Sequence, residues 1–167
     1  MQKCSKWACV LMLICCAQTA IAGERLKVIQ MPGDGDCLFW SLTAHQFKTQ
    51  EWRTPRHHAA TITLRRDIAD ALASGAYQEA LELTLIAEQK SDGLPCQSNR
   101  YIETLKSGQL QGGELEIKVA AELMDINVIV HLPNGTMISY PHNKTHAKTT
   151  HIQYLPGHYN YLTDETT

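Results

Sequence analysis

Strand-like patterns occur near the start of this chain and in its last third, and the stretch between them is helical in pattern. Residues 26–31 form a short strand pattern. Apolar spacing then predicts helices over 64–73, 77–89, 100–106 and 112–123. Four strand patterns follow, over 126–131, 137–140, 151–155 and 158–162. This order excludes a regular strand–helix–strand series and favours an α+β fold or a three-layer α/β arrangement.

Two local signals mark turns and connections. Asn134-Gly135 between two strand patterns predicts a type I′ hairpin turn, which requires two positive φ angles. Residues 49–58 are polar, and we expect them to form a connection before the first long helix.

The segment from Met1 to Ala22 has the pattern of a secretory signal peptide. Two lysines give a basic start, an apolar run follows over 7–17, and Ala20-Ile21-Ala22 supplies small residues for cleavage. The run is shorter than the roughly 20 apolar residues that span a bilayer. We therefore expect cleavage after Ala22, secretion, and a single domain over 23–167. Membrane attachment is expected only if this segment stays uncleaved.

Cysteine usage and charge narrow the class of protein further. Four of the six cysteines lie within the expected signal peptide, so the expected mature chain keeps only Cys37 and Cys96. Two cysteines form no disulfide framework, so either they pair or one is present for its reactivity. The net charge of −2 argues against a nucleic-acid partner, because binding phosphates requires a basic face.

The histidines outside the last strand pattern do not suggest a metal site. His57 and His58 are adjacent, and their side chains diverge. Three more lie in a polar stretch without cysteines or clustered carboxylates: His142, His146 and His151. We expect all five to be solvated, with no metal and no cofactor.

Cys37 is the first candidate for chemistry. It follows five turn-forming residues, Pro32-Gly33-Asp34-Gly35-Asp36, and begins a helical pattern in which Asp36 is the expected N-cap. The start of a helix stabilises a thiolate, and free amides of the preceding turn can bind an oxyanion. The alternative is a half-buried cysteine with a structural role.

His158 is the best-placed partner for a thiolate. It begins a strand pattern, and Asn160 follows two residues later, on the same face of the strand. Asn160 can therefore orient the imidazole and leave its other nitrogen for Cys37. This is the arrangement of a Cys-His-Asn protease.

Four sequence blocks, in order, resemble the ovarian tumour (OTU) family of cysteine deubiquitinases. Asp34-Gly35-Asp36-Cys37-Leu38-Phe39 resembles the Asp-Gly-x-Cys-Leu-Phe signature of the family, and Leu64-Arg65 resembles its Leu-Arg helix. Gly112-Gly113-Glu114-Leu115-Glu116 resembles the Trp-Gly-Gly-x-x-Glu block, and His158-Tyr159-Asn160 resembles the His-Tyr-Asn/Asp ending. The resemblance spans roughly residues 26–163. Two departures are Gln111 in place of the Trp, and Trp40 where the family more often has Arg or a small residue.

The resemblance implies a papain-like α+β fold with a small central β-sheet packed between helices. It also implies a thiol hydrolase that cuts isopeptide or peptide bonds of ubiquitin or polyubiquitin. By position, Cys37 is the nucleophile, His158 the base and Asn160 the orienting residue. Asp34 belongs to the catalytic set, in a loop with Gly35 and Asp36 that shapes the oxyanion hole.

Two alternatives to this function remain open. One is an enzyme of the same fold that acts on a ubiquitin-like modifier or another peptide, and the other is a non-catalytic ubiquitin-binding module.

Export also conflicts with an intracellular substrate. One resolution is a bacterial effector delivered into a eukaryotic host cell. Another is a compartment where Cys37 and Cys96 form a disulfide, which would inactivate the enzyme until it is reduced.

Overall fold

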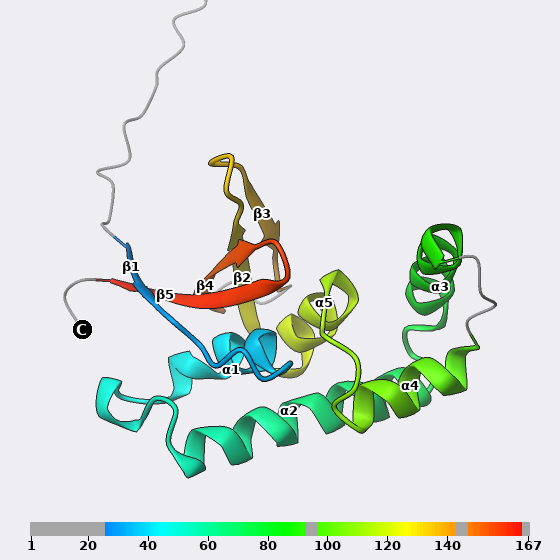
Figure 1. The fold of residues 1–167 in the computed structure, drawn as a ribbon, viewed down its shortest axis with the longest axis horizontal. Coiled ribbons are helices and arrows are strands. Elements are labelled where there is room, and N and C mark those ends of the chain that lie inside the picture. Colours follow the sequence, from blue (N-terminus) through cyan, green and yellow to red (C-terminus); the bar gives the residue numbers. More distant parts are fainter. Residues whose placement is uncertain (1–25, 93–96, 143–146, 165–167) are drawn as a thin grey trace, which may run out of the picture.

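The computed structural model describes residues 26–92, 97–142 and 147–164 (Figure 1). The helices are α1 (Cys37–Thr43), α2 (Pro55–Ala73), α3 (Gln78–Asp92), α4 (Ser98–Lys106) and α5 (Glu114–Leu123), with short 3₁₀ turns at Ala44–Gln46 and Thr49–Glu51. The strands are β1 (Leu26–Ile29), β2 (Ile126–His131), β3 (Met137–Tyr140), β4 (Lys148–Leu155) and β5 (His158–Asp164). The expected signal peptide and Cys96 lie outside the described residues. No helix in the described ranges is long and apolar enough to cross a membrane.

The five strands form one mixed sheet in the order β1-β5-β4-β2-β3. Strands β2 and β4 are parallel, and the other neighbouring pairs are antiparallel. Strand β5 therefore lies between β1 and β4, with Val28 paired to Leu162 and Ile152 paired to Tyr161. This pairing brings the first and last described strands together and holds His158, the first residue of β5, beside the loop that follows β1.

The helices that contact the sheet pack against one of its faces. Helix α1 contacts β5 and β4, and α5 contacts β2 and β3 (Figure 1). The sheet side of this core includes Val128, Val130 and Ile152, each at most 3% exposed. Helix α2 contacts α1, α4 and α5. The α+β class predicted from the sequence is confirmed.

Helix α2 begins earlier than its apolar spacing predicts. The polar stretch over 49–58 was expected to be a connection, but α2 already starts at Pro55. Thr54 caps the helix by accepting the His57 N–H, and proline is favoured at the first helical position because its fixed φ suits the helix. The prediction missed this start because the first turn is polar.

The hairpin between β2 and β3 also differs from the prediction. Among the described residues, positive φ angles occur at Gly135 and not at Asn134, so the turn is not type I′. The Gly135 N–H bonds to the Leu132 carbonyl, which places Pro133 and Asn134 at the centre of the turn. The proline ring fixes a negative φ and favours the central position that it occupies here, so Gly135 alone takes the left-handed conformation.

His57 is buried rather than solvated, which corrects the sequence-based expectation. Its ring lies 4.7 Å from the rings of both Trp40 and Phe47. The Nδ1 atom accepts the Arg53 N–H at 3.1 Å, so Nε2 carries the proton and donates to the Trp40 carbonyl or the Thr43 hydroxyl. His142 and His151 are also half-buried and have partners, Asp125 and His131, whereas His146 lies outside the described residues.

Candidate active site

Cys37 is the first residue of α1; the residue is 6% exposed, and its thiol is free. The loop before it carries Gly35 at a φ of +90°, a conformation that favours glycine. The Ser41 hydroxyl donates to the Cys37 carbonyl at 2.8 Å, and the Trp40 N–H bonds to the Asp36 carbonyl. The nucleophile candidate therefore lies at a fixed junction between a tight loop and a buried helix.

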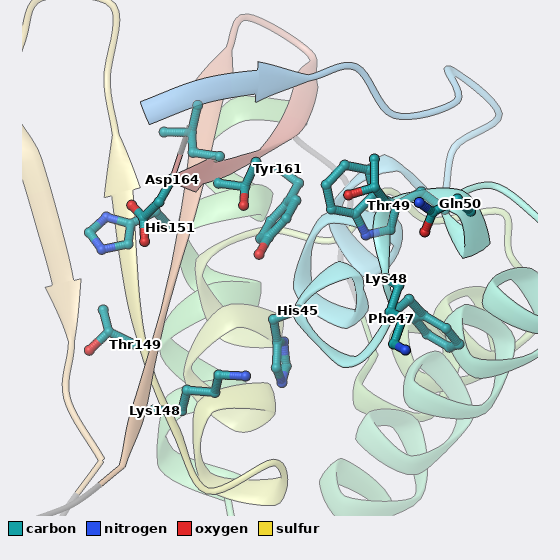
Figure 2. A pocket seen from close by; sticks show the side chains of 13 residues that line it. His45, Phe47, Lys48, Thr49, Gln50, Lys148, Thr149, His151, Tyr161 and Asp164 are labelled. Carbon is teal, nitrogen blue, oxygen red and sulfur yellow. The ribbon is translucent and has the colours of Figure 1, made fainter. Parts of the chain in front are cut away.

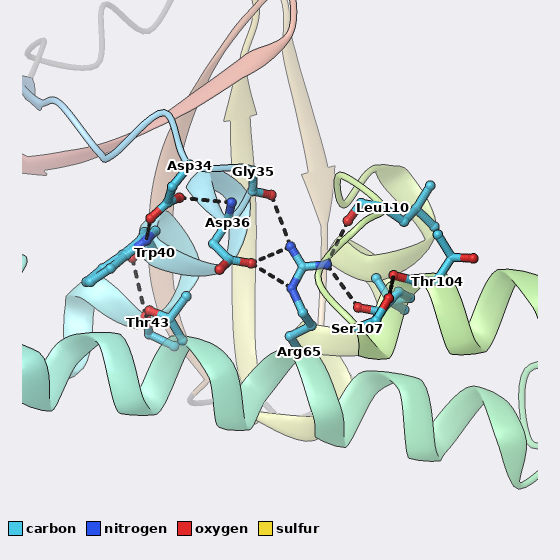
Figure 3. A network of polar contacts seen from close by, with 11 residues as sticks. Asp34, Gly35, Asp36, Trp40, Thr43, Arg65, Thr104, Ser107 and Leu110 are labelled. Carbon is cyan, nitrogen blue, oxygen red and sulfur yellow. Dashed lines mark hydrogen bonds and ion pairs between the residues drawn. The ribbon is translucent and has the colours of Figure 1, made fainter.

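The Asp34 carboxylate is bound within its own loop. One oxygen accepts the Asp36 N–H at 3.0 Å, and the other accepts the Trp40 indole N–H at 3.1 Å (Figure 3). Trp40, a departure from the family pattern, thus supplies the second donor for Asp34. Because the Asp36 amide already has an acceptor, it is not available to an oxyanion. The Gly35 and Cys37 amides have no acceptor among the described residues, and they remain the candidate donors.

Asp36 precedes α1, but its side chain does not cap the helix as predicted. Its carboxylate is instead bound by Arg65 of α2, whose Nε lies 2.6 Å from Oδ1 (Figure 3). A charged, buried guanidinium is a stronger partner for a carboxylate than the amides of a helix turn. No local pattern indicates this contact, because the two residues are 29 positions apart.

A cavity of about 270 Å³ opens beside Cys37. Its other lining residues come from two further segments: Gln111, Gly112 and Gly113 before α5, and Tyr154, Gly157 and Tyr159 around the turn between β4 and β5. Backbone glycines and two aromatic rings thus line the walls.

His158 and Asn160 form the pair that the sequence predicts. His158 Nε2 lies 3.0 Å from Asn160 Oδ1. The same oxygen accepts the Met31 N–H at 3.1 Å, and a backbone N–H only donates, so this atom of Asn160 acts as the acceptor. The proton of His158 is therefore on Nε2, and Nδ1 is left with a lone pair. Gly157 and Tyr159, the sequence neighbours of His158, both line the cavity with Cys37.

The wall before α5 depends on close packing and on a buried carboxylate. A Cβ at Gly112 would lie 2.6 Å from Leu38 Cδ2 and 2.9 Å from Phe39 Cζ, so only glycine fits there without movement of α1. Glu116, 1% exposed, accepts the Gly113 N–H at 2.7 Å and the Tyr101 hydroxyl at 2.8 Å. Both glycines of this block are thus tied to the core.

The Tyr159 side chain stays protonated at neutral pH. Burial raises the pKa of Tyr159 well above its usual value, and the neighbouring Tyr154, Tyr140 and Cys37 add to the shift. Its ring lies 5.1 Å from that of Tyr154. Tyr159 therefore acts as a neutral, rigid wall of the cavity rather than as an acid or base.

A larger cavity, of about 530 Å³, does not have Cys37 in its lining. Figure 2 shows the side chains that line it. Its lining includes His45, Trp52, Lys148 and Tyr161, but no cysteine. In the described ranges, no group of three or more histidine, cysteine or carboxylate side chains is placed to hold a metal ion. The smaller cavity, with its thiol, is the better candidate for the active site.

A buried thiol at a helix start, next to a turn whose histidine is oriented by an asparagine, is the arrangement of a cysteine-type hydrolase. The family model for OTU-like cysteine proteases matches residues 32–161 of this chain. The chain belongs to this family and is a cysteine-type hydrolase. No curated protein sequence matches it.

Solved structures with the same fold include viral OTU proteases and a bacterial OTU deubiquitinase. The viral OTU domain protease of Taggert virus has a TM-score of 0.60 and 18% identity, over 85% of this chain and 81% of that chain. An OTU domain in complex with ubiquitin has a TM-score of 0.59 and 17% identity, over 85% and 72%. An OTU deubiquitinase from Wolbachia pipientis wMel has a TM-score of 0.58 and 16% identity, over 85% and 90%.

The structure brings together most of the residues that the sequence singled out. Cys37 lines the cavity, the loop of Asp34, Gly35 and Asp36 directly precedes it in the chain, and His158 pairs with Asn160. Sequence reasoning assigned no role to Arg65, Glu116 or Tyr154. Arg65 and Glu116 belong to sequence blocks that resemble the family, and this resemblance could have indicated a role for them. No pattern in the sequence indicates a role for Tyr154.

Proposed function

We propose that this hydrolase is a deubiquitinase that uses Cys37, His158 and Asn160. The observation that carries the proposal is the glycine- and tyrosine-lined cavity at the Cys37 thiol, which suits the C-terminal glycine of ubiquitin. The presence of ubiquitin in complexes with related OTU domains adds support, including the Hazara virus OTU, which has a TM-score of 0.52 and 17% identity over 85% of this chain and 83% of that chain.

In the proposed reaction, His158 Nδ1 takes the Cys37 proton, and the thiolate attacks the carbonyl carbon of the terminal glycine of ubiquitin. The Gly35 and Cys37 amides donate to the resulting oxyanion. The C–N bond then breaks, and His158 returns the proton to the leaving lysine amine. Water, deprotonated by His158, hydrolyses the thioester and releases the ubiquitin carboxylate and the Cys37 thiol. Asn160 keeps the proton of His158 on Nε2 throughout.

The test uses reduced protein and ubiquitin that carries a C-terminal thiol-reactive electrophile. Intact mass should show one ubiquitin adduct, mapped to Cys37 and lost in Cys37→Ala. The matched control is Ser41→Ala, one turn further along α1, which should keep the adduct. No adduct, with Cys37 still open to a small alkylating agent, would point to a ubiquitin-like modifier or another peptide as the substrate.

Export and delivery into a eukaryotic host cell form a second part of the proposal. Support comes from the basic, apolar and small-residue regions of the segment from Met1 to Ala22. Expression of the full chain in a secreting bacterium should yield a product that begins at Gly23. A cell-retained product with an intact N-terminus would contradict export. Comparing activity with and without reductant on that product tests the Cys37–Cys96 disulfide.

A further inference from the structure

Arg65 is a buried charge that the proposed reaction does not use. Its side chain extends from α2 and is 3% exposed, and its guanidinium carbon lies 4.2 Å from the centre of the Phe39 ring. An arginine is rarely buried unless all its donors are paired, because desolvating a charge is costly. The hydrogen-bond partners of Arg65 therefore indicate the role of this buried charge.

The five N–H donors of the guanidinium all have acceptors. Nε binds the Asp36 carboxylate, and Nη2 binds that carboxylate and the Gly35 carbonyl at 3.0 Å. Nη1 donates to the carbonyls of Leu105 and Leu110, at 3.0 and 2.6 Å. Figure 3 shows the guanidinium between the Gly35–Asp36 loop on one side and Leu110 on the other.

Apart from the Leu105 carbonyl near the end of α4, these acceptors belong to the two segments that meet at the active-site cavity. Gly35 and Asp36 directly precede Cys37, and Leu110 directly precedes Gln111, Gly112 and Gly113 of the opposite wall. Helices α1, α2, α3 and α4 lie between the two segments in the chain, so no local structure sets their spacing. The buried Arg65 side chain binds both segments.

Arg65 also fixes the orientation of one peptide plane in the loop. The carbonyl of the peptide between Gly35 and Asp36 accepts from Arg65 Nη2, and the N–H of the same peptide donates to Asp34. With this plane held from both sides, the amides before and after it, of Gly35 and Cys37, keep one direction. Those are the two amides that the proposed reaction uses for the oxyanion.

We propose that Arg65 is a positioning residue that keeps the oxyanion-binding amides of the 34–37 loop in place and sets their distance from the wall at 111–113. The inference rests on the proposed roles of Cys37 and this loop. Arg65 acts on the transition state through the backbone and does not touch the thiol. Lysine cannot replace it, because an ammonium has three donors and no planar fork to bridge two loops.

The test compares Arg65→Lys with Arg66→Lys, an exposed neighbour on α2. The kcat and KM are measured with a C-terminal coumarin amide of ubiquitin, and turnover is also measured with p-nitrophenyl acetate, a small activated ester. The rate of Cys37 alkylation by iodoacetamide is the third readout, since that displacement forms no oxyanion. Thermal unfolding and circular dichroism report whether each variant folds.

For Arg65→Lys we expect kcat to fall roughly 100-fold on both substrates, the size of effect seen when an oxyanion donor is lost. KM for the ubiquitin amide and the alkylation rate should stay within about threefold, and Arg66→Lys should match the wild type. A folded Arg65→Lys with unchanged kcat overturns the inference. So does an alkylation rate that falls in parallel with kcat, since that indicates a general distortion around the thiol.

Asp36→Asn covers the case in which Arg65→Lys fails to fold. It keeps the shape of the carboxylate and weakens the same clamp, so kcat should fall while alkylation is unchanged, and an unchanged kcat overturns the inference. A wild type that cleaves the ester but not the ubiquitin amide contradicts the proposed function alone, and the ester then tests Arg65. A wild-type protein that cleaves neither the ester nor the ubiquitin amide overturns the proposed function and the inference about Arg65.

Discussion

Asn160 Oδ1 and His158 Nε2 lie 3.0 Å apart, and this contact determines which nitrogen of the histidine carries the proton. Because the Met31 N–H donates to the same oxygen, Asn160 cannot present its amide nitrogen there. The lone pair of His158 is therefore on Nδ1. A strand near each end of the chain is needed for this, since Met31 follows β1 and His158 begins β5.

Asn160→Ala should lower kcat about 100-fold, within the range that general acid–base catalysis contributes. Loss of the acceptor frees the imidazole to rotate and to change tautomer, but Cys37 and the oxyanion amides stay in place. Steady-state cleavage of the ubiquitin coumarin amide measures the change. Gln153→Ala is the control, because the Gln153 side chain accepts from the amide nitrogen of Asn160, at 3.4 Å, and not from the oxygen atom that binds His158. Equal losses in the two variants would contradict an orienting role.

Gly112→Ala should destabilise the fold by about 1–3 kcal/mol, the typical cost of overpacking a core. The added methyl would lie within 3 Å of Leu38 and Phe39, the residues that follow Cys37 in α1, so we also expect lower activity. Gly113→Ala is the neighbouring control, since its nearest contact is 3.8 Å away. Urea unfolding of both variants gives the comparison, and similar losses of stability would show that Gly112 is not a packing constraint.

Parts of this structure follow from short-range patterns in the sequence. The strand at Ile126–His131 was predicted with its observed bounds, because alternation and flanking turn residues are local signals. The pairing of His158 with Asn160 followed from the period of two along a strand.

What sequence reasoning missed depends on contacts between distant segments. The Asp36 carboxylate was expected to cap α1, but Arg65 competes for it from 29 residues away. His57 was expected to be solvated, yet the rings of Trp40 and Phe47 enclose it. Burial of a polar side chain depends on which partners the fold brings to it, and local composition does not contain that information.

The stability of the protein should fall with acidification, in part because of His57. Burial lowers the pKa of His57 below its ordinary value of 6.5, and its hydrogen bond to the Trp40 carbonyl only partly opposes this shift. At a pH between the folded and unfolded pKa values, His57 is therefore protonated in the unfolded chain and neutral in the folded chain. The contribution of His57 to the free energy of unfolding is present in full above about pH 6.5. It is lost as the pH falls from there toward the folded pKa, by at most about 1.4 kcal/mol per pH unit for one histidine.

His57→Asn should reduce that pH dependence. Burial also lowers the pKa values of His45 and His131, so the slope should become shallower without vanishing. The free energy of unfolding between pH 5 and 7.5 is the measurement, with Thr63→Ala, an exposed change on α2, as the control. Parallel curves for His57→Asn and the wild type would show that His57 does not contribute.

Tyr159 should act through its ring and not through its hydroxyl. Because burial keeps the phenol protonated, Tyr159→Phe should leave kcat and KM for the ubiquitin amide within about threefold across pH 6–9. Tyr159→Ala removes one wall of the Cys37 cavity and the contact with the Tyr154 ring. We expect KM to rise about tenfold, which corresponds to about 1.4 kcal/mol of lost binding. A large fall in kcat for Tyr159→Phe would instead place the hydroxyl in the reaction, since this variant differs from the wild type only in the hydroxyl group.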